Sequence, residues 1–452
     1  MLTISRILHA GYVFECDGTR IAFDTIFENP FSRNCYAFPD VRFDHALIRH
    51  QRFDAVFISH FHDDHCSLES LDLLDRDTPL YIYCLFDELF DMVRQLGFRR
   101  VAALRLDDPV KVGAFEVVPR EAMDANVDSM FQVKAAGLNV LNVVDSWIDD
   151  ATLAQLVADG PWDMVLWPFQ TMRELEVLAP SRAPAAPAAL PEEWLDQLKA
   201  LAPRYVVPSS CQFLQEPWSW YNRAFFPISY TLFAREVGAA LPQAQVVRLD
   251  PSVSVRLDAV SLRPAPPLDW VIPVGEQDVD YVYEGNAAPP STADIARRFA
   301  PLTQAQLARV MDYCRVELPG KYAEVEAASD YFDRPRIWQL SVYDHEGQAT
   351  RFRYLLDPED GACLDEDGEP LAWTTEIPAA KLYAALELGE SLTSMYMRIN
   401  DTVFDADVER DLADADVVDD PLIRCLFSDT FGAYQAAQLR RLLGTVAAVE
   451  QG

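Results

Sequence analysis

The residues best suited to chemistry form a short cluster near the N-terminus. Residues 58–65 read Ile-Ser-His-Phe-His-Asp-Asp-His, and four potential metal ligands lie within six positions: His60, His62, Asp64 and His65. Side chains two positions apart in an extended loop project to the same side, so His60 and His62 are predicted to bind one metal. Asp64 and His65 project to the other side of the turn and are predicted to bind a second. Zn²⁺ accepts such a nitrogen and oxygen set, and so does iron.

Histidine is scarce elsewhere in the chain, which makes the cluster informative. Three of the seven histidines fall between positions 60 and 65, and none lies between 66 and 344. We therefore interpret the cluster as a metal site rather than a solvated polar loop. His9 precedes a predicted strand, where it either faces the pocket or is a structural histidine.

The elements around the cluster indicate a layered α/β fold. Residues 12–16 and 19–24 flank Asp17-Gly18, which predicts a two-residue hairpin. The β-rich run 55–59 ends at the cluster, and Ser67 is predicted to cap a helix just after it. Further predicted strands alternate with helices and hairpins, which favours mixed sheets; they lie at 79–84, 115–118, 130–134, 138–144, 164–167 and 205–208.

The pattern His-x-His-x-Asp-His after a short strand resembles the metallo-β-lactamase superfamily over roughly residues 1–260. The hairpin leading to Phe23-Asp24 and the opening His9-Ala10-Gly11 are also similar to members of that superfamily. The metallo-hydrolase-like part of CMP-N-acetylneuraminate hydroxylase is similar as well, but its Rieske cluster has no counterpart here because the paired Cys/His motifs are missing. The resemblance implies a four-layer αββα sandwich that binds one or two divalent transition metals per chain.

The resemblance also shows where this sequence departs from the superfamily. Asp145, at the end of the strand 138–144, matches the aspartate that bridges two metals. Two further histidine ligands have no counterpart, and by position their replacements are Asp124 or Asp128 for the first, and Cys211 or Gln212 for the second. The outcomes left open are a dinuclear site with replacement ligands, a single metal, or a degenerate pocket. Zn²⁺ is favoured, although added carboxylates shift the preference toward iron or manganese.

Three parts are predicted along the chain: a metal-binding catalytic domain over 1–265, a Pro-rich linker over 266–290 and an acidic α+β accessory domain over 291–452. In the last part, the pattern of strand, acidic turn and strand resembles sterol-carrier-like domains. A generic accessory role is the alternative, or a dimerisation role that would make the chain a homodimer. From 357 to 420 the chain has 19 Asp/Glu and 3 Lys/Arg, which we interpret as a solvated acidic face.

Charge and composition restrict the partners. With 38 basic and 71 acidic residues, the net charge of −33 disfavours nucleic acid and polyanionic substrates. No apolar run is long enough to span a membrane, and no secretory signal is found. Eight scattered cysteines without a framework indicate free thiols in the cytoplasm. An aromatic segment is predicted to form a pocket wall around a small-molecule substrate: Trp218, Trp220, Tyr221 and Arg223.

We expect a metal-dependent hydrolase in which a metal-bound water or hydroxide attacks a small-molecule substrate. A non-haem iron or diiron oxygenase or oxidase that uses the same His/Asp site is the first alternative. A non-catalytic, metal-stabilised binding protein is the second.

Overall fold

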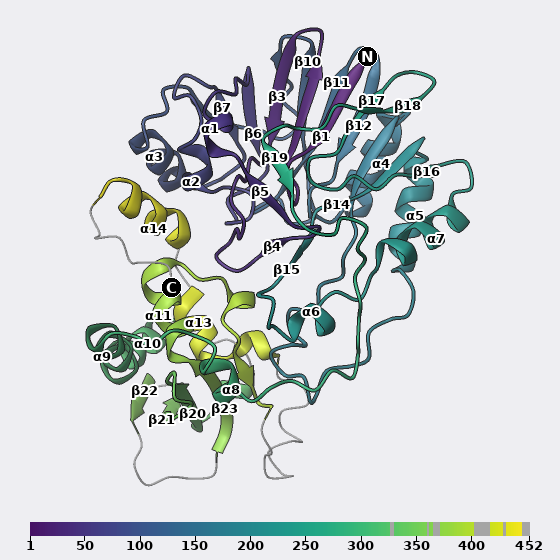
Figure 1. Cartoon of the computed structure of the whole chain (residues 1–452). Helices are drawn as coiled ribbons and strands as arrows, with labels where there is room; N and C mark the ends of the chain where they lie inside the picture. The colour runs from purple at the N-terminus through teal and green to yellow at the C-terminus, as the bar shows by residue number, and fades with distance from the viewer. Residues whose placement is uncertain (326–329, 359–360, 365–370, 402–415, 428–430, 445–452) are drawn as a thin grey trace. The chain divides into compact units, whose positions relative to one another are not determined.

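The computed structural model describes residues 1–325, 330–358, 361–364, 371–401, 416–427 and 431–444 (Figure 1). The chain divides into two compact units. The first consists mainly of Met1–Met172 and Ala186–Glu284, and the second mainly of Arg173–Ala185 and Gly285–Ala437. The limits predicted for the domains, at 265 and 291, stay predictions.

The first unit contains an eight-stranded sheet that carries the histidine cluster. Its order is β18-β17-β1-β2-β3-β6-β7-β8. The hairpin predicted at Asp17-Gly18 is confirmed, since β2 and β3 pair antiparallel with Cys16 opposite Thr19. The strands are β1 (Leu2–Arg6), β2 (Tyr12–Cys16), β3 (Thr19–Phe23), β6 (Ala55–Ile58), β7 (Leu80–Ile82), β8 (Val101–Ala103), β17 (Ser254–Leu257) and β18 (Leu262–Ala265).

A seven-stranded sheet, in the order β16-β14-β13-β12-β11-β10-β9, faces the first. Strands β10 to β12 are antiparallel neighbours, and β12, β13, β14 and β16 run parallel. Its strands are β9 (Val110–Val112), β10 (Phe115–Glu121), β11 (Ser129–Ala135), β12 (Leu138–Asn142), β13 (Met164–Pro168), β14 (Tyr205–Ser209) and β16 (Gln245–Val246).

Apolar side chains from the two sheets fill the space between them. Phe23 and Phe57 of the first sheet belong to one buried cluster with Phe131, Val140 and Leu166 of the second. The rings of Phe23 and Phe131 lie 5.1 Å apart, so the sheets are in direct contact. Such burial of apolar surface is the main force that holds two sheets face to face.

Helices cover the outer faces of both sheets (Figure 1). Beside the first sheet lie α1 (His45–Ile48), α2 (Leu68–Leu71) and α3 (Asp87–Gln95), and beside the second lie α4 (Asp150–Ala158), α5 (Glu192–Leu201) and α7 (Tyr230–Ala240). The order helix, sheet, sheet, helix is the predicted four-layer αββα sandwich of the metallo-β-lactamase type. The predicted fold class is thereby confirmed.

The second unit contains a sheet in the order β22-β21-β20-β23-β24, in which β20 and β23 run parallel and the other neighbours antiparallel. Its strands are β20 (Arg336–Tyr343), β21 (Ala349–Asp357), β22 (Gly361–Leu364), β23 (Leu371–Pro378) and β24 (Arg398–Ile399), and its helices include α9 (Gln304–Asp312), α10 (Leu318–Glu324), α11 (Ala379–Leu388) and α13 (Pro421–Phe427). This agrees with the predicted α+β class, while the sterol-carrier-like resemblance stays a prediction. Part of the acidic stretch, 402–415, lies outside the described residues.

Two chain-wide features bear on the sequence analysis. No helix among the described residues is both long enough and apolar enough to cross a membrane. All eight cysteines are free thiols, and seven of them are buried.

Gly11 lies in the turn between β1 and β2, which also carries His9. A Cβ at this position would lie 2.6 Å from the carbonyl oxygen of Asp24 and 2.9 Å from that of Leu8. Real Cβ atoms do not approach backbone oxygens so closely, so the turn requires glycine here. The glycine of the opening His9-Ala10-Gly11 is thus a steric requirement of this turn.

We predict that Gly11→Ala lowers the free energy of unfolding by about 1–3 kcal/mol, because backbone must move to admit the methyl group. Gly238→Ala is the matched control: a Cβ there meets nothing within 4 Å inside helix α7, and the change should raise stability by about 0.5–1 kcal/mol. Urea unfolding of both variants measures the difference. Equal stabilities for the two would contradict the assignment of Gly11.

Candidate metal centre

The predicted ligand loop begins where strand β6 ends. All four residues of β6 are buried, and the strand runs parallel between β3 and β7, a setting that selects a continuous apolar run. The loop after it is tied to the end of β3, because the Asp24 carboxylate accepts hydrogen bonds from the Ser59 backbone N–H and the Ser59 hydroxyl, both at 2.8 Å. Asp24, Ser59 and His60 are all buried.

Asp24 and Ser59 also determine which imidazole nitrogens face the centre. The Nδ1 atom of His65 lies 3.1 Å from the Asp24 carboxylate, which only accepts hydrogen bonds, so His65 carries its proton on Nδ1. The Ser59 hydroxyl gives its proton to Asp24 and accepts one from Nδ1 of His60 at 2.9 Å. Both histidines therefore direct Nε2 at the centre, as metal ligands do. Burial opposes the protonation of His65, but the Asp145 and Asp64 carboxylates raise its pKa well above the usual value, so a metal that binds His65 would displace the Nε2 proton.

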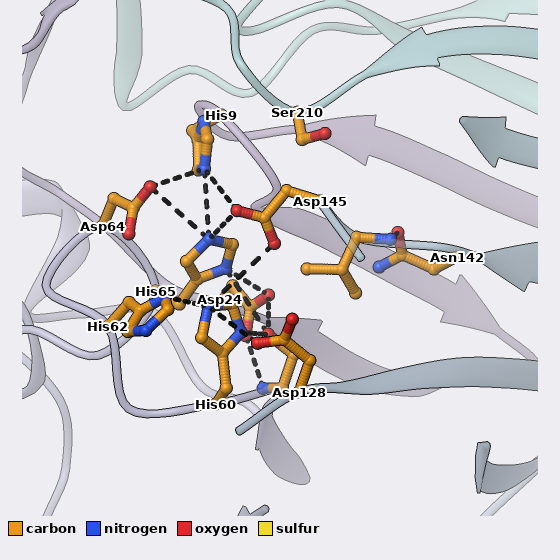
Figure 2. A network of polar contacts seen from close by, with 12 residues as sticks. His9, Asp24, His60, His62, Asp64, His65, Asp128, Asn142, Asp145 and Ser210 are labelled. Carbon is orange, nitrogen blue, oxygen red and sulfur yellow. Dashed lines mark hydrogen bonds and ion pairs between the residues drawn. The ribbon is translucent and has the colours of Figure 1, made fainter. Parts of the chain in front are cut away.

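Two groups of candidate ligands result (Figure 2). In the first, His60 Nε2 lies 2.9 Å from His62 Nδ1 and 3.7 Å from Asp128 Oδ1. In the second, the ligand atoms of His9, Asp64, His65 and Asp145 all lie within 4.8 Å of one another. His60 and His62 thus lie in one group and His65 in the other, and the assignment of a metal to each group stays a prediction.

Asp145 lies between the groups. One of its carboxylate oxygens is 3.0 Å from His65 Nε2, and the other is 4.0 Å from His60 Nε2. Burial opposes the ionisation of Asp145, but the His65 and His60 imidazoles outweigh it and hold the pKa of this carboxyl below its usual range. The pKa of Asp64 is lowered well below the ordinary value in the same way, by His65 and His9 against burial. Both groups thus remain anionic.

Asp128 is the replacement candidate that the structure brings into the first group. Its backbone N–H donates to the Asp124 carbonyl at 2.8 Å, which closes the turn that places it there. Burial, reinforced by the nearby Asp145 carboxylate, raises the pKa of Asp128 to about 7. The Asp124 side chain instead accepts from the Asn126 backbone N–H at 3.2 Å and belongs to neither group.

His9 reaches the second group from the turn between β1 and β2. Its Nε2 atom lies 3.0 Å from Asp64 Oδ2 and 3.1 Å from His65 Nε2. From the sequence, His9 is only a pocket candidate, because nothing in the sequence places residue 9 beside residues 60–65. The two other replacement candidates, Cys211 and Gln212, are buried and lie in neither group, although the Cys211 backbone N–H donates to His9 Nδ1 at 3.0 Å.

The predicted pocket wall lies around helix α6 (Tyr221–Ala224). Tyr221 is fully buried and its ring stacks on Phe225 at 5.8 Å. The Arg223 side chain is 64% exposed and pairs with Glu284 at 3.0 Å. The role of this segment, including Trp218 and Trp220, as a wall for substrate stays a prediction.

The donor set fits divalent transition metals. The Asp128 Oδ1 and Asp145 Oδ1 atoms are buried and accept no hydrogen bond from any described residue. Buried carboxylate oxygens normally have partners, so two orphaned acceptors beside imidazole nitrogens are what a cation would satisfy. The His/Asp cluster is thus consistent with a metal site.

Comparisons with known proteins show that this chain is similar in fold to several solved structures. No family model and no curated protein matches the chain. Among solved structures, Igni18, a metallo hydrolase from Ignicoccus hospitalis, is 18% identical, with a TM-score of 0.39 over 57% of this chain and 99% of its own. YhfI from Bacillus subtilis, a metallo-β-lactamase fold protein, is 12% identical, with a TM-score of 0.37 over 56% and 99%. CmlA, a diiron β-hydroxylase from Streptomyces venezuelae, is 16% identical, with a TM-score of 0.39 over 57% of this chain and only 54% of CmlA.

We predict that Asp128→Asn weakens metal binding by the first group roughly 10–100-fold, because it removes an anionic oxygen donor. Asp124→Asn, in the same turn, should leave the affinity unchanged and serves as the matched control. Titration of the metal-free protein with Zn²⁺, followed by calorimetry, measures both. The reverse order of effects would show that Asp124 is the ligand.

Proposed function

We propose that this protein is a metal-dependent hydrolase that acts on a small-molecule substrate at the His/Asp centre. The observation that carries the proposal is the position of Asp145, whose two carboxylate oxygens face different ligand groups. One group would consist of His60, His62 and Asp128, and the other of Asp64, His65 and Asp145. Two divalent metals per chain are proposed, with Zn²⁺ favoured.

A bound divalent metal would supply Lewis acidity, which lowers the pKa of a coordinated water and polarises the bond to be cleaved. The residues of the chain would orient the reaction. Asp24 and Ser59 keep Nε2 of His60 and of His65 directed at the centre. The anionic Asp145 would contribute to both groups of ligands. The exposure of His62 supports entry of substrate from its side of the centre.

A non-haem iron oxygenase or oxidase is the second candidate, and one observation favours it. The first group contains two histidines and one carboxylate, His60, His62 and Asp128, the ligand set typical of iron(II) oxygenases with open positions. The same set also serves zinc hydrolases, so the residues alone do not separate the two chemistries. A non-catalytic, metal-stabilised binding protein is the third.

Apolar side chains on the loops around the centre support a substrate with an apolar part. Leu85 and Phe86 follow β7, Met123 follows β10, and Trp147 follows Asp145; all four are more than 40% exposed. The Phe61 ring lies 5.1 Å from the His62 ring and 5.9 Å from the Phe86 ring, which connects this apolar set to the centre. The eight free cysteines support a cytoplasmic location.

The deciding experiment is elemental analysis of protein purified without added metal, combined with turnover measured in the absence of O₂. We expect zinc and oxygen-independent hydrolysis, reduced at least about 100-fold in Asp145→Asn because the shared ligand is weakened. Asp150→Asn, on the exposed start of α4, is the control. Two irons with substrate-dependent O₂ consumption would establish the oxygenase instead. Absence of metal, with unchanged stability in His60→Ala, would leave the binding protein.

The exposed apolar side chains around the centre lead to a separate prediction about substrate specificity. With a series of p-nitrophenyl esters of growing acyl length, kcat/KM should rise by roughly fourfold per methylene, since each buried CH₂ contributes about 0.8 kcal/mol. Trp147→Ala should flatten this dependence without changing metal content. A dependence that stays equally steep in this variant would show that Trp147 does not contact the substrate.

A further inference from the structure

The hydrogen bonding of His9 distinguishes it from His60 and His65. In those two residues, Nδ1 donates a hydrogen bond and Nε2 is the nitrogen directed at the centre. In His9 the direction is reversed, because the backbone N–H of Cys211 points at Nδ1 from 3.0 Å. A nitrogen that accepts a hydrogen bond carries no proton, so the neutral His9 ring carries its proton on Nε2.

The partners of His9 Nε2 agree with this tautomer. Asp64 Oδ2, at 3.0 Å, is a carboxylate oxygen and only accepts. His65 Nε2 lies 3.1 Å from His9 Nε2, and its Nδ1 is directed to Asp24, so a metal bound to His65 would take the Nε2 lone pair. Asp64 is thus the acceptor of the His9 Nε2–H in this structure.

A closed ring of hydrogen bonds holds His9 in this state. The buried Arg6 guanidinium donates to the His9 carbonyl oxygen and to the Tyr12 hydroxyl oxygen. The Tyr12 hydroxyl is 2.8 Å from that of Ser209, at the end of β14, two residues before Cys211. Cys211 closes the ring through His9 Nδ1.

Backbone strain and packing show that this arrangement is imposed on His9. His9, Ser210 and Cys211 have φ angles of 51°, 30° and 52°, in the left-handed region that residues with a Cβ rarely adopt. Such conformations persist where surrounding contacts determine them, often at functional sites. The rings of Phe31 and Phe213 lie 5.6 and 6.0 Å from that of His9. Flipping the imidazole would turn a C–H toward the Cys211 N–H and lose the hydrogen bond.

We propose that His9 is a hydrogen-bond donor to the metal centre rather than a metal ligand. The proposal deepens the proposed function and rests on it. A second metal would then be held by Asp64, His65 and Asp145, which leaves room for substrate, as in catalytic sites. The His9 Nε2–H, which lies against Asp64 in this structure, would donate instead to the negative charge that develops on the oxygen of a bound substrate.

The number of metals bound per chain distinguishes the two possible roles of His9, hydrogen-bond donor and metal ligand, independently of activity. His9→Ala and His9→Gln are titrated with Co²⁺ and Zn²⁺, and the exposed His50→Gln is the matched control. A donor predicts the wild-type number of metals per chain in all three variants. It also predicts a kcat loss of roughly 100-fold in His9→Ala, with part of the rate restored by the amide N–H of His9→Gln. Loss of one metal per chain in both His9 variants would overturn the proposal and leave the proposed function intact.

The tautomer of His9 can be measured on the unaltered protein, so the proposal can be tested even where the His9 variants fail to fold. In metal-free protein labelled with ¹⁵N-histidine, the His9 signals, assigned by their absence in His9→Gln or by contacts to Phe31, should show a protonated Nε2. A protonated Nδ1 would overturn the proposal. Failure of the wild-type protein to bind any metal would instead refute the proposed function, so the two failures are distinguishable.

Discussion

The centre depends on one buried carboxylate, that of Asp24. It has no exposure to solvent, and its two oxygens receive the Ser59 amide, the Ser59 hydroxyl and the Nδ1–H of His65. A buried charge is tolerated only where hydrogen bonds of this kind replace water. Through these hydrogen bonds, Asp24 joins β3 to the start of the ligand loop and sets which nitrogen of two histidines faces the centre. The direction of the remaining ligands follows from that arrangement.

Much of this could be predicted because the signals are local. The run 55–58 followed by a polar cluster indicates a buried strand and its loop, and Asp145 lies shortly after another largely buried strand, Leu138–Asn142. Asp124 and Asp128 could not be separated, since both lie in one turn and only the backbone hydrogen bond between them decides which faces the centre. His9 could not be placed because its position depends on β1, β2 and the end of β14 meeting in space, and its tautomer depends on a backbone amide of residue 211.

Charge in the centre is unbalanced without a cation. Asp64, Asp128 and Asp145 crowd together, and the rise of the Asp128 pKa to about 7 reflects burial together with repulsion from Asp145. Four imidazoles relieve this only in part, because burial lowers the pKa of His60 and of His62 and so favours their neutral forms. Divalent cations would neutralise the remaining negative charge of the carboxylates.

The ligands come from loops of both sheets, and this has a mechanical consequence. His60, His62, Asp64 and His65 follow β6 of the eight-stranded sheet, whereas Asp128 and Asp145 belong to the seven-stranded sheet. A metal held by both sets would be a further link between layers that hydrogen bonds already join at this edge, among them Tyr12–Ser209 and Cys211–His9. Because it would bind the folded chain and not the unfolded one, it would stabilise the fold by mass action, in a protein whose cysteines form no disulfide. The edge of the sandwich that carries the His/Asp centre would then be its most rigid edge while metal is bound, and its first to open when metal is withdrawn.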